Sequence, residues 1–274
     1  MTDSAPDVFT VDVHGHYGSM DRGLGELVDR FMSGEAGEVA ARAERSNIDW
    51  TVISPLRGLV PRFSANPVIG NADAEKMVPA TPGLLQWVII DPREPETFEQ
   101  ADRMLQHPWC VGVKIHPEEH GYPITEFGEE IFRFCAERGA LVLTHSGEQN
   151  SLPMDYVPLL DRYADARLIL AHLGNGWDND PSHQVRAVQA SRHCNIWTDT
   201  SSARSIWPGL IEWAVAEIGA DRILFGSDTP LYLAGMQRFR IVDAEISDED
   251  RALILGRNAE ALLGLTGRDP RSGW

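Results

Sequence analysis

The chain contains little cysteine. Its 274 residues include three cysteines, Cys110, Cys135 and Cys194, which are widely spaced and form no Cys-x-x-Cys motif. An odd number of cysteines without a pairing pattern argues against a disulfide framework and is typical of proteins from a reducing compartment.

Signals for membranes and secretion are missing as well. The first ten residues, "MTDSAPDVFT", have neither a basic start nor an apolar core, and no apolar run approaches the length of a transmembrane helix. We therefore expect a soluble, cytoplasmic protein with no membrane partner.

Positive charge is scarce relative to negative charge. Lysine and arginine number 24 against 41 aspartates and glutamates, which gives a formal net charge of −17. Because such a charge repels phosphate backbones, we expect no nucleic-acid partner. The expected partner is a small-molecule substrate, and a homo-oligomer is compatible with the sequence.

The apolar content, 43% of the residues, can fill a sizeable core, and we expect a single domain over residues 1–274. Short β-rich runs alternate with helical patterns along the chain. The predicted strands are Phe9–His16, Trp50–Pro55, Leu84–Asp91, Val111–Pro117, Ala140–Glu148, Arg167–Gly174, Asn195–Ser201 and Arg222–Pro230. Between them, Thr125–Gly139 has an apolar helical face and ends in glycine.

About eight strand–helix units at this length predict an α/β fold, the TIM (β/α)8 barrel. A doubly wound open sheet usually carries a glycine-rich phosphate turn after its first strand, and here a His-Gly-His sequence takes that place. Residues Arg57–Gly83, rich in proline, glycine and asparagine, are predicted to form an elaborated loop after strand 2 that could act as a lid.

Polar side chains recur at the carboxyl ends of the predicted strands. Alternate residues share a face of a strand, so "VDVHGHYG" directs His14 and His16 to one side, and Gly15 is expected to be small so that an outer helix packs closely. His145, His172 and Asp228 end later strands. Since the active site of a TIM barrel lies at this end, these groups should converge. Imidazoles and a carboxylate predict a divalent metal, with Zn²⁺ favoured and Mn²⁺, Fe²⁺ or Co²⁺ as alternatives.

These motifs, "DVHGH", "GVKIHP", "LTHSGE", "LAHLGN" and "FGSDTP", resemble those of the amidohydrolase superfamily. The closest resemblance is to the amidohydrolase 2 branch, which includes aminocarboxymuconate-semialdehyde decarboxylase-like enzymes and lactonases. The tail "LILGRNAEALLGL" is also similar to the closing helix of that branch, so that the resemblance extends from about Val11 to Leu265.

The resemblance implies a role for each matched residue. His14, His16 and Asp228 would hold one metal ion, with His145 as a further ligand. His172 would bind a second ion or polarise the substrate, and Asp228 would also take a proton from the attacking water. A bound cation can lower the pKa of water to about 7.

The number of metal ions stays open. Lys114 in "GVKIHP" lies where two-metal members often have a carboxylated lysine that bridges the ions. The alternative, which we favour slightly, is that Lys114 remains an ammonium group and binds a substrate carboxylate or a nearby acid.

Further residues are candidates for substrate binding. His116 shares a face with Lys114, and Tyr17 follows the histidine pair. Arg57 and Arg204 follow strands 2 and 7 and could bind an anionic substrate through paired hydrogen bonds. For each of them a structural role is the alternative: exposure before a turn for His116, packing for Tyr17 and surface ion pairs for the arginines.

Two enzymatic functions fit this site. The first is a metal-dependent hydrolase that attacks the amide, lactone or ester carbonyl of a small, carboxylate-bearing substrate. The second is a lyase of the same branch, a non-oxidative decarboxylase or hydratase. A barrel that binds metal without turnover is the third interpretation, and the complete set of expected ligands argues against it.

Overall fold

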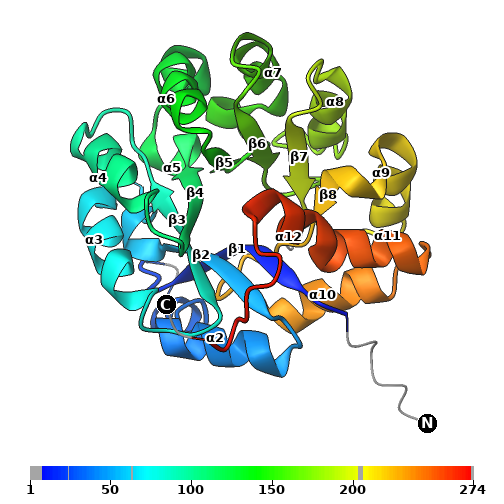
Figure 1. The fold of residues 1–274 in the computed structure, drawn as a ribbon, viewed down its shortest axis with the longest axis horizontal. Coiled ribbons are helices and arrows are strands. Elements are labelled where there is room, and N and C mark those ends of the chain that lie inside the picture. Colours follow the sequence, from blue (N-terminus) through cyan, green and yellow to red (C-terminus); the bar gives the residue numbers. More distant parts are fainter. Residues whose placement is uncertain (1–7, 24, 63, 203–205, 273–274) are drawn as a thin grey trace.

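Eight parallel strands form one sheet in the order β1 to β8, each hydrogen-bonded to the next (Figure 1). The computed structural model describes residues 8–23, 25–62, 64–202 and 206–272. The strands are β1 (Val11–Tyr17), β2 (Trp50–Pro55), β3 (Leu84–Ile89), β4 (Cys110–Ile115), β5 (Leu141–Thr144), β6 (Arg167–Leu170), β7 (Ile196–Asp199) and β8 (Ile223–Leu224).

Helices alternate with the strands and surround the sheet (Figure 1). They are α1 (Glu26–Phe31), α2 (Ala36–Arg45), α3 (Pro67–Met77), α4 (Glu96–Met104), α5 (Pro117–His120), α6 (Ile124–Arg138), α7 (Pro153–Arg162), α8 (His183–Ala190), α9 (Leu210–Ile218), α10 (Ala234–Val242), α11 (Asp248–Ala252) and α12 (Asn258–Leu263). Short turns η1 (Leu56–Gly58), η2 (Gln149–Ser151), η4 (Ala220–Arg222) and η5 (Leu253–Arg257) complete the elements. No described helix is long and apolar enough to cross a membrane.

The sheet closes between β8 and β1. β8 has two residues, but the chain beyond it continues along β1: Thr229 bridges to Gly15 in parallel, and the amide of Asp228 donates to the carbonyl of His14 at 2.7 Å. The amide of Val13 donates to the carbonyl of Phe225 at 2.9 Å. The predicted TIM barrel is therefore confirmed.

Several strands are shorter than predicted at their carboxyl ends. β5 ends at Thr144 and β6 at Leu170, so that His145 and His172 lie in the turns that follow. Gly147 and Gly174, with φ of 101° and 87°, adopt a backbone conformation that glycine tolerates and a strand does not use. The polar strand ends are thus the first residues of the βα loops.

The predicted elaborated loop after strand 2 contains a helix, α3. Asn66 accepts a hydrogen bond from the amide of Ile69 and Pro67 occupies the first turn, which together start α3. Loop structure flanks α3, between η1 and α3 on one side and between α3 and β3 on the other, and Leu59 and Val60 belong to the first of these loops. There, Leu59 and Val60 are buried rather than part of an open lid.

Apolar side chains fill two zones. One cluster lies between the sheet and helices α4, α6 and α7 and contains Ile131 and Phe132 of α6, the helix predicted over Thr125–Gly139. A second cluster joins residues of several strands, among them Trp87 and Leu143, to Ala259 of α12. Figure 1 shows α12 across one end of the barrel, which it closes. The site described below lies at the carboxyl ends of the strands.

Gly15, between the two histidines of β1, is crowded by neighbouring strands rather than by an outer helix. A Cβ atom there would lie 2.7 Å from Cγ2 of Thr51 and 3.3 Å from Cγ2 of both Ile53 and Thr229. Gly15→Ala is therefore expected to lower the free energy of unfolding by about 1–3 kcal/mol through overpacking. Urea denaturation measures this, and an unchanged midpoint with an unchanged slope would contradict the expectation.

Candidate metal centre

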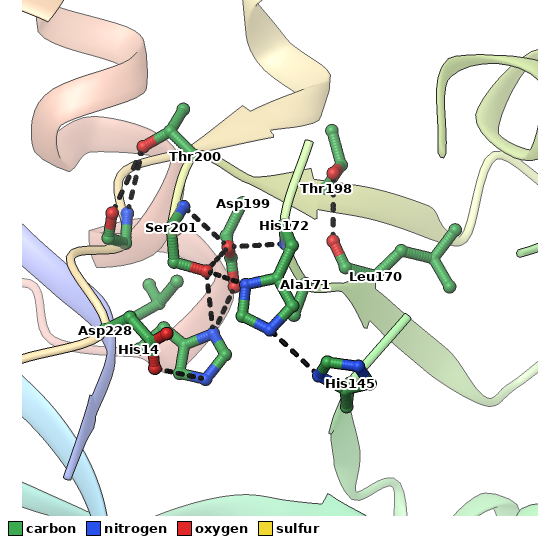
Figure 2. A network of polar contacts seen from close by, with 12 residues as sticks. His14, His145, Leu170, Ala171, His172, Thr198, Asp199, Thr200, Ser201 and Asp228 are labelled. Atoms are coloured by element: carbon green, nitrogen blue, oxygen red, sulfur yellow. Dashed lines mark hydrogen bonds and ion pairs between the residues drawn. The ribbon is translucent and has the colours of Figure 1, made fainter. Parts of the chain in front are cut away.

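Five of the predicted site residues meet at the carboxyl ends of the strands, and Figure 2 shows His14, His145, His172 and Asp228 among them. His14 and His16 lie in β1, His145 and His172 follow β5 and β6, and Asp228 follows β8. His172 and Asp228 have positive φ values of 69° and 60°, which side chains other than glycine adopt infrequently. The fold holds both residues in this conformation, as is common at functional sites.

His14, His16 and Asp228 form the tightest group. Nε2 of His16 lies 3.0 Å, and Nε2 of His14 3.7 Å, from Oδ1 of Asp228. All three residues are buried, and their ligand atoms lie within 4.8 Å of one another. Two nitrogens and one carboxylate oxygen are a donor set that Zn²⁺, Mn²⁺ or Fe²⁺ accepts.

The opposite nitrogens of both rings have their own partners. Nδ1 of His14 lies 2.9 Å from Oδ2 of Asp199, and Nδ1 of His16 lies 3.2 Å from the carbonyl oxygen of Ser54. Nδ1 of His16 also lies 3.0 Å from Oγ of Ser54, a hydroxyl that can donate or accept, so these contacts accommodate either tautomer of His16. In the tautomer with the proton on Nδ1, Nε2 of His16 and Oδ1 of Asp228 are two electron-rich atoms 3.0 Å apart, a pair that a divalent cation would hold together. The residues therefore fit a divalent metal.

Asp228 is suited to bind a cation. Burial by itself would raise its pKa, but the hydrogen bond with His16 and the interactions with the neighbouring imidazoles of His14 and His172 bring the pKa of Asp228 well below its usual value. Asp228 is consequently a carboxylate at neutral pH, as a metal ligand or a general base requires.

Lys114 of β4 is fully buried beside this group. Its Nζ donates a hydrogen bond to Nε2 of His14 at 2.9 Å. Burial lowers the pKa of Lys114 to about 8, although Asp199 and Asp228 act in the opposite direction. The structure thus brings Lys114 to the predicted site, next to the ligand atom of His14.

His145 and His172 form a second pair of imidazoles. Nε2 of His172 lies 3.0 Å from Nδ1 of His145, while Nε2 of His145 lies 3.2 Å from Oε2 of Glu148. Burial, followed by the charges of His145 and His14, lowers the pKa of His172 well below its usual value. His172 is therefore a neutral imidazole between the metal candidates and the pocket.

Asp199 at the end of β7 was not predicted as a site residue. It is fully buried and accepts hydrogen bonds from Nδ1 of His14 and from the backbone amides of His172 and Ser201. Figure 2 shows Asp199 and Ser201 behind the two imidazoles. The sequence carried a signal, since "TDTS" puts polar residues at a strand end like those that were selected.

A buried carboxylate behind a ligating histidine fixes the ring and raises its basicity, and such partners commonly change metal affinity 10- to 100-fold. We expect Asp199→Asn to weaken metal binding by about this factor. Competition with a chelating dye measures the dissociation constant. Asp91→Asn, which changes a buried carboxylate paired with Arg93, is the control, and equal affinities of the two variants would contradict the assignment.

A cavity of about 150 Å³ opens above these groups. It is lined by His14, His16, His145, His172 and Asp228, by Arg22, Glu119, Glu148 and Asn175, and by Leu56, Leu59, Val60, Leu231 and Tyr232 together with His116 and Ser202. His116 stacks on His145 with ring centroids 4.3 Å apart, and its Nδ1 accepts from the amide of Glu119 at the start of α5. His116 is thus placed in the cavity wall.

Two of the predicted substrate contacts, Tyr17 and Arg57, do not line the cavity, and a third lies outside the described residues. Tyr17 is buried in a cluster with Val39 of α2 and does not line the cavity, since its side chain faces the helices. Arg57 is exposed, with Nη1 3.4 Å from Oδ2 of Asp73 on α3, and it does not line the cavity either. Arg204 lies outside the described residues.

A family model described as Amidohydrolase (amidohydrolase 2) matches residues 11–265. No curated protein matches the sequence significantly.

Solved structures of similar fold include three decarboxylases. LigW, a 5-carboxyvanillate decarboxylase from Sphingomonas paucimobilis, has a TM-score of 0.72 and 15% identity over 94% of this chain and 100% of its own. A 2,6-dihydroxybenzoate decarboxylase from Rhizobium has a TM-score of 0.72 and 15% identity over 95% of this chain and 100% of its own. A dihydroxybenzoic acid decarboxylase from Polaromonas sp. JS666, with bound manganese, has a TM-score of 0.72 and 16% identity over 94% and 97%.

Proposed function

This chain belongs to the amidohydrolase family, and on that premise we propose that it is a metal-dependent, non-oxidative decarboxylase of a small aromatic or unsaturated carboxylic acid. A divalent cation held by His14, His16 and Asp228 would supply a Lewis acid that binds and orients the oxygen atoms of the substrate. We propose manganese or zinc as that cation; the Polaromonas decarboxylase contains manganese.

One observation carries the proposal: aliphatic side chains line the cavity together with the candidate metal ligands. Leu56 and Leu59 are 1% exposed, and they line the cavity together with Val60 and Leu231. These apolar side chains can contact the apolar body of an aromatic or unsaturated acid, while the polar groups of the lining bind its oxygen atoms. Loss of CO₂ disperses the carboxylate charge and consumes no water, whereas hydrolysis requires a water molecule in the site.

Decarboxylation replaces the carboxylate by hydrogen, RCOO⁻ + H⁺ → RH + CO₂, and needs one proton delivered to carbon. The imidazole pair His172 and His145 supports this step. His172 lines the cavity, and its Nε2 contacts Nδ1 of His145, whose side chain is 13% exposed and can exchange protons with solvent. We assign proton delivery to this pair.

Hydrolysis remains the second candidate because of Asp228. Its lowered pKa keeps the side chain ionised, and an ionised carboxylate in the cavity can accept a proton from an attacking water. A hydrolase would use the same residues in the metal site but would form a different product.

Product analysis separates the two functions. Manganese-loaded protein is incubated with hydroxybenzoic acids, unsaturated acids and lactones in ¹⁸O-labelled water, followed by measurement of CO₂ and mass spectrometry. The proposal expects CO₂ release from an acid and no ¹⁸O in the organic product. If ¹⁸O from the labelled water instead enters the product of a lactone and no CO₂ is released, the protein is a hydrolase and not a decarboxylase.

A further inference from the structure

Charged side chains from three βα loops meet at the rim of the metal cavity. Arg22 follows β1, Arg62 lies between η1 and α3, and Glu118 and Glu119 belong to α5. Nη2 of Arg22 pairs with Oε1 of Glu119, and Nη2 of Arg62 lies 3.3 Å from Oε1 of Glu118 and 3.8 Å from Oε1 of Glu119. Glu119 therefore faces two guanidinium groups.

Arg22 differs from Arg62 in its position. Arg22 lines the cavity that contains His14, His16 and Asp228. Among the described residues, no other arginine or lysine lines this cavity. Arg62 pairs with the same glutamate without lining the cavity. The Arg22 side chain is 38% exposed, whereas that of Glu119 is 9% exposed, so Arg22 has room to move and Glu119 does not.

The charges around the cavity define what Arg22 can bind. Three carboxylates, Asp228, Glu119 and Glu148, line the same space and disfavour an anionic substrate. A metal ion at the histidines offsets one negative group of the substrate. A second negative group needs its own cation, and a guanidinium group binds a carboxylate through two parallel hydrogen bonds.

We propose that Arg22 binds a second anionic group of the substrate, so that the site prefers dicarboxylic acids, and that Glu119 holds Arg22 in the empty site. On binding, the substrate carboxylate replaces Glu119 as the partner of Arg22, while Arg62 remains to neutralise Glu119. The inference rests on the proposed function for the reaction of the first carboxylate. The preference for a second carboxylate depends on Arg22 itself.

Binding of two unreactive probes, isophthalate and benzoate, tests the inference by calorimetry on the manganese-loaded protein. The wild type is expected to bind isophthalate more tightly than benzoate. Arg22→Gln should weaken isophthalate binding by about ten- to a hundredfold, the range for a hydrogen bond to a charged group, and leave benzoate binding unchanged. Arg22→Lys should retain part of the preference because it keeps the charge but not the planar fork. Arg57→Gln, which changes an exposed arginine that pairs with Asp73 and does not line the cavity, is the matched control and should preserve the preference.

Equal affinity of the wild type for both probes would overturn the inference, as would an equal loss for both probes in Arg22→Gln. The proposed function fails separately. If no acid releases CO₂ but Arg22→Gln selectively loses isophthalate, decarboxylation is wrong and the assignment of Arg22 stands. If CO₂ is released and Arg22→Gln leaves the KM for dicarboxylic acids unchanged, the assignment of Arg22 is wrong and decarboxylation stands.

Discussion

Replacement of Asp228 by asparagine is expected to lower kcat at least about a thousandfold, the scale seen when a preorganised charged or polar group is removed from an active site. The physical reason is that Oδ1 of Asp228 lies 3.0 Å from Nε2 of His16 in a buried group. A neutral amide cannot offset the charge of a divalent cation there, and it cannot act as a base. The same variant should therefore lose bound metal.

Steady-state kinetics and elemental analysis measure the two effects together. Asp91→Asn is the control, because Asp91 is a buried carboxylate at the end of β3 that pairs with Arg93 and does not line the cavity. If Asp228→Asn kept both its metal and its turnover, neither the ligand role nor the base role of Asp228 would hold.

Removal of the metal by chelation is expected to abolish turnover and to lower the melting temperature. A ligand that binds only the folded protein stabilises it by about 2.7 kcal/mol at a hundredfold excess over its dissociation constant. For a chain of this size that corresponds to a shift of roughly 5 °C or more.

Differential scanning calorimetry of chelated and manganese-reconstituted protein measures the shift, and addition of manganese should restore turnover. The His14→Ala variant provides the control, since its melting temperature should respond much less to manganese. Identical melting curves and full activity after verified removal of the metal would exclude a metal-dependent site.

The fold was predictable because buried parallel strands appear in the sequence as short apolar runs at regular intervals. Trp50–Pro55 was predicted with the observed bounds of β2, and the helix over Thr125–Gly139 is α6 to within one residue at each end. The strand ends were less predictable. A polar residue after an apolar run is equally consistent with the last strand position and the first loop position, and His145 and His172 occupy the loop.

The convergence of the candidate metal ligands was predictable because the barrel brings strand ends together in a fixed order. His14, His16 and Asp228 needed only the alternation of side chains along β1 and the closure of β8 onto β1. The substrate contacts depend on loop conformations. Arg57 and Arg22 both follow barrel strands, and only the path of each loop places Arg22 in the cavity and Arg57 on the surface.

The chemistry of the site was less predictable than its location. The same candidate ligands fit a hydrolase and a decarboxylase. The residues on which we base the proposal of decarboxylation are aliphatic. In the sequence, nothing distinguishes Leu56, Leu59 and Val60 from ordinary core residues. Their position in the lining of the cavity, together with the histidines, appears only in the folded chain.

Anomalous diffraction at the manganese edge, from crystals of the manganese-loaded protein, tests the central claim most directly. We expect a peak within bonding distance of Nε2 of His14, Nε2 of His16 and a carboxylate oxygen of Asp228. The same anomalous map shows whether a second ion is present, and the ordinary electron density shows whether Lys114 is modified. A metal-replete crystal with no peak at these three side chains, or with its peak elsewhere in the barrel, would contradict the account.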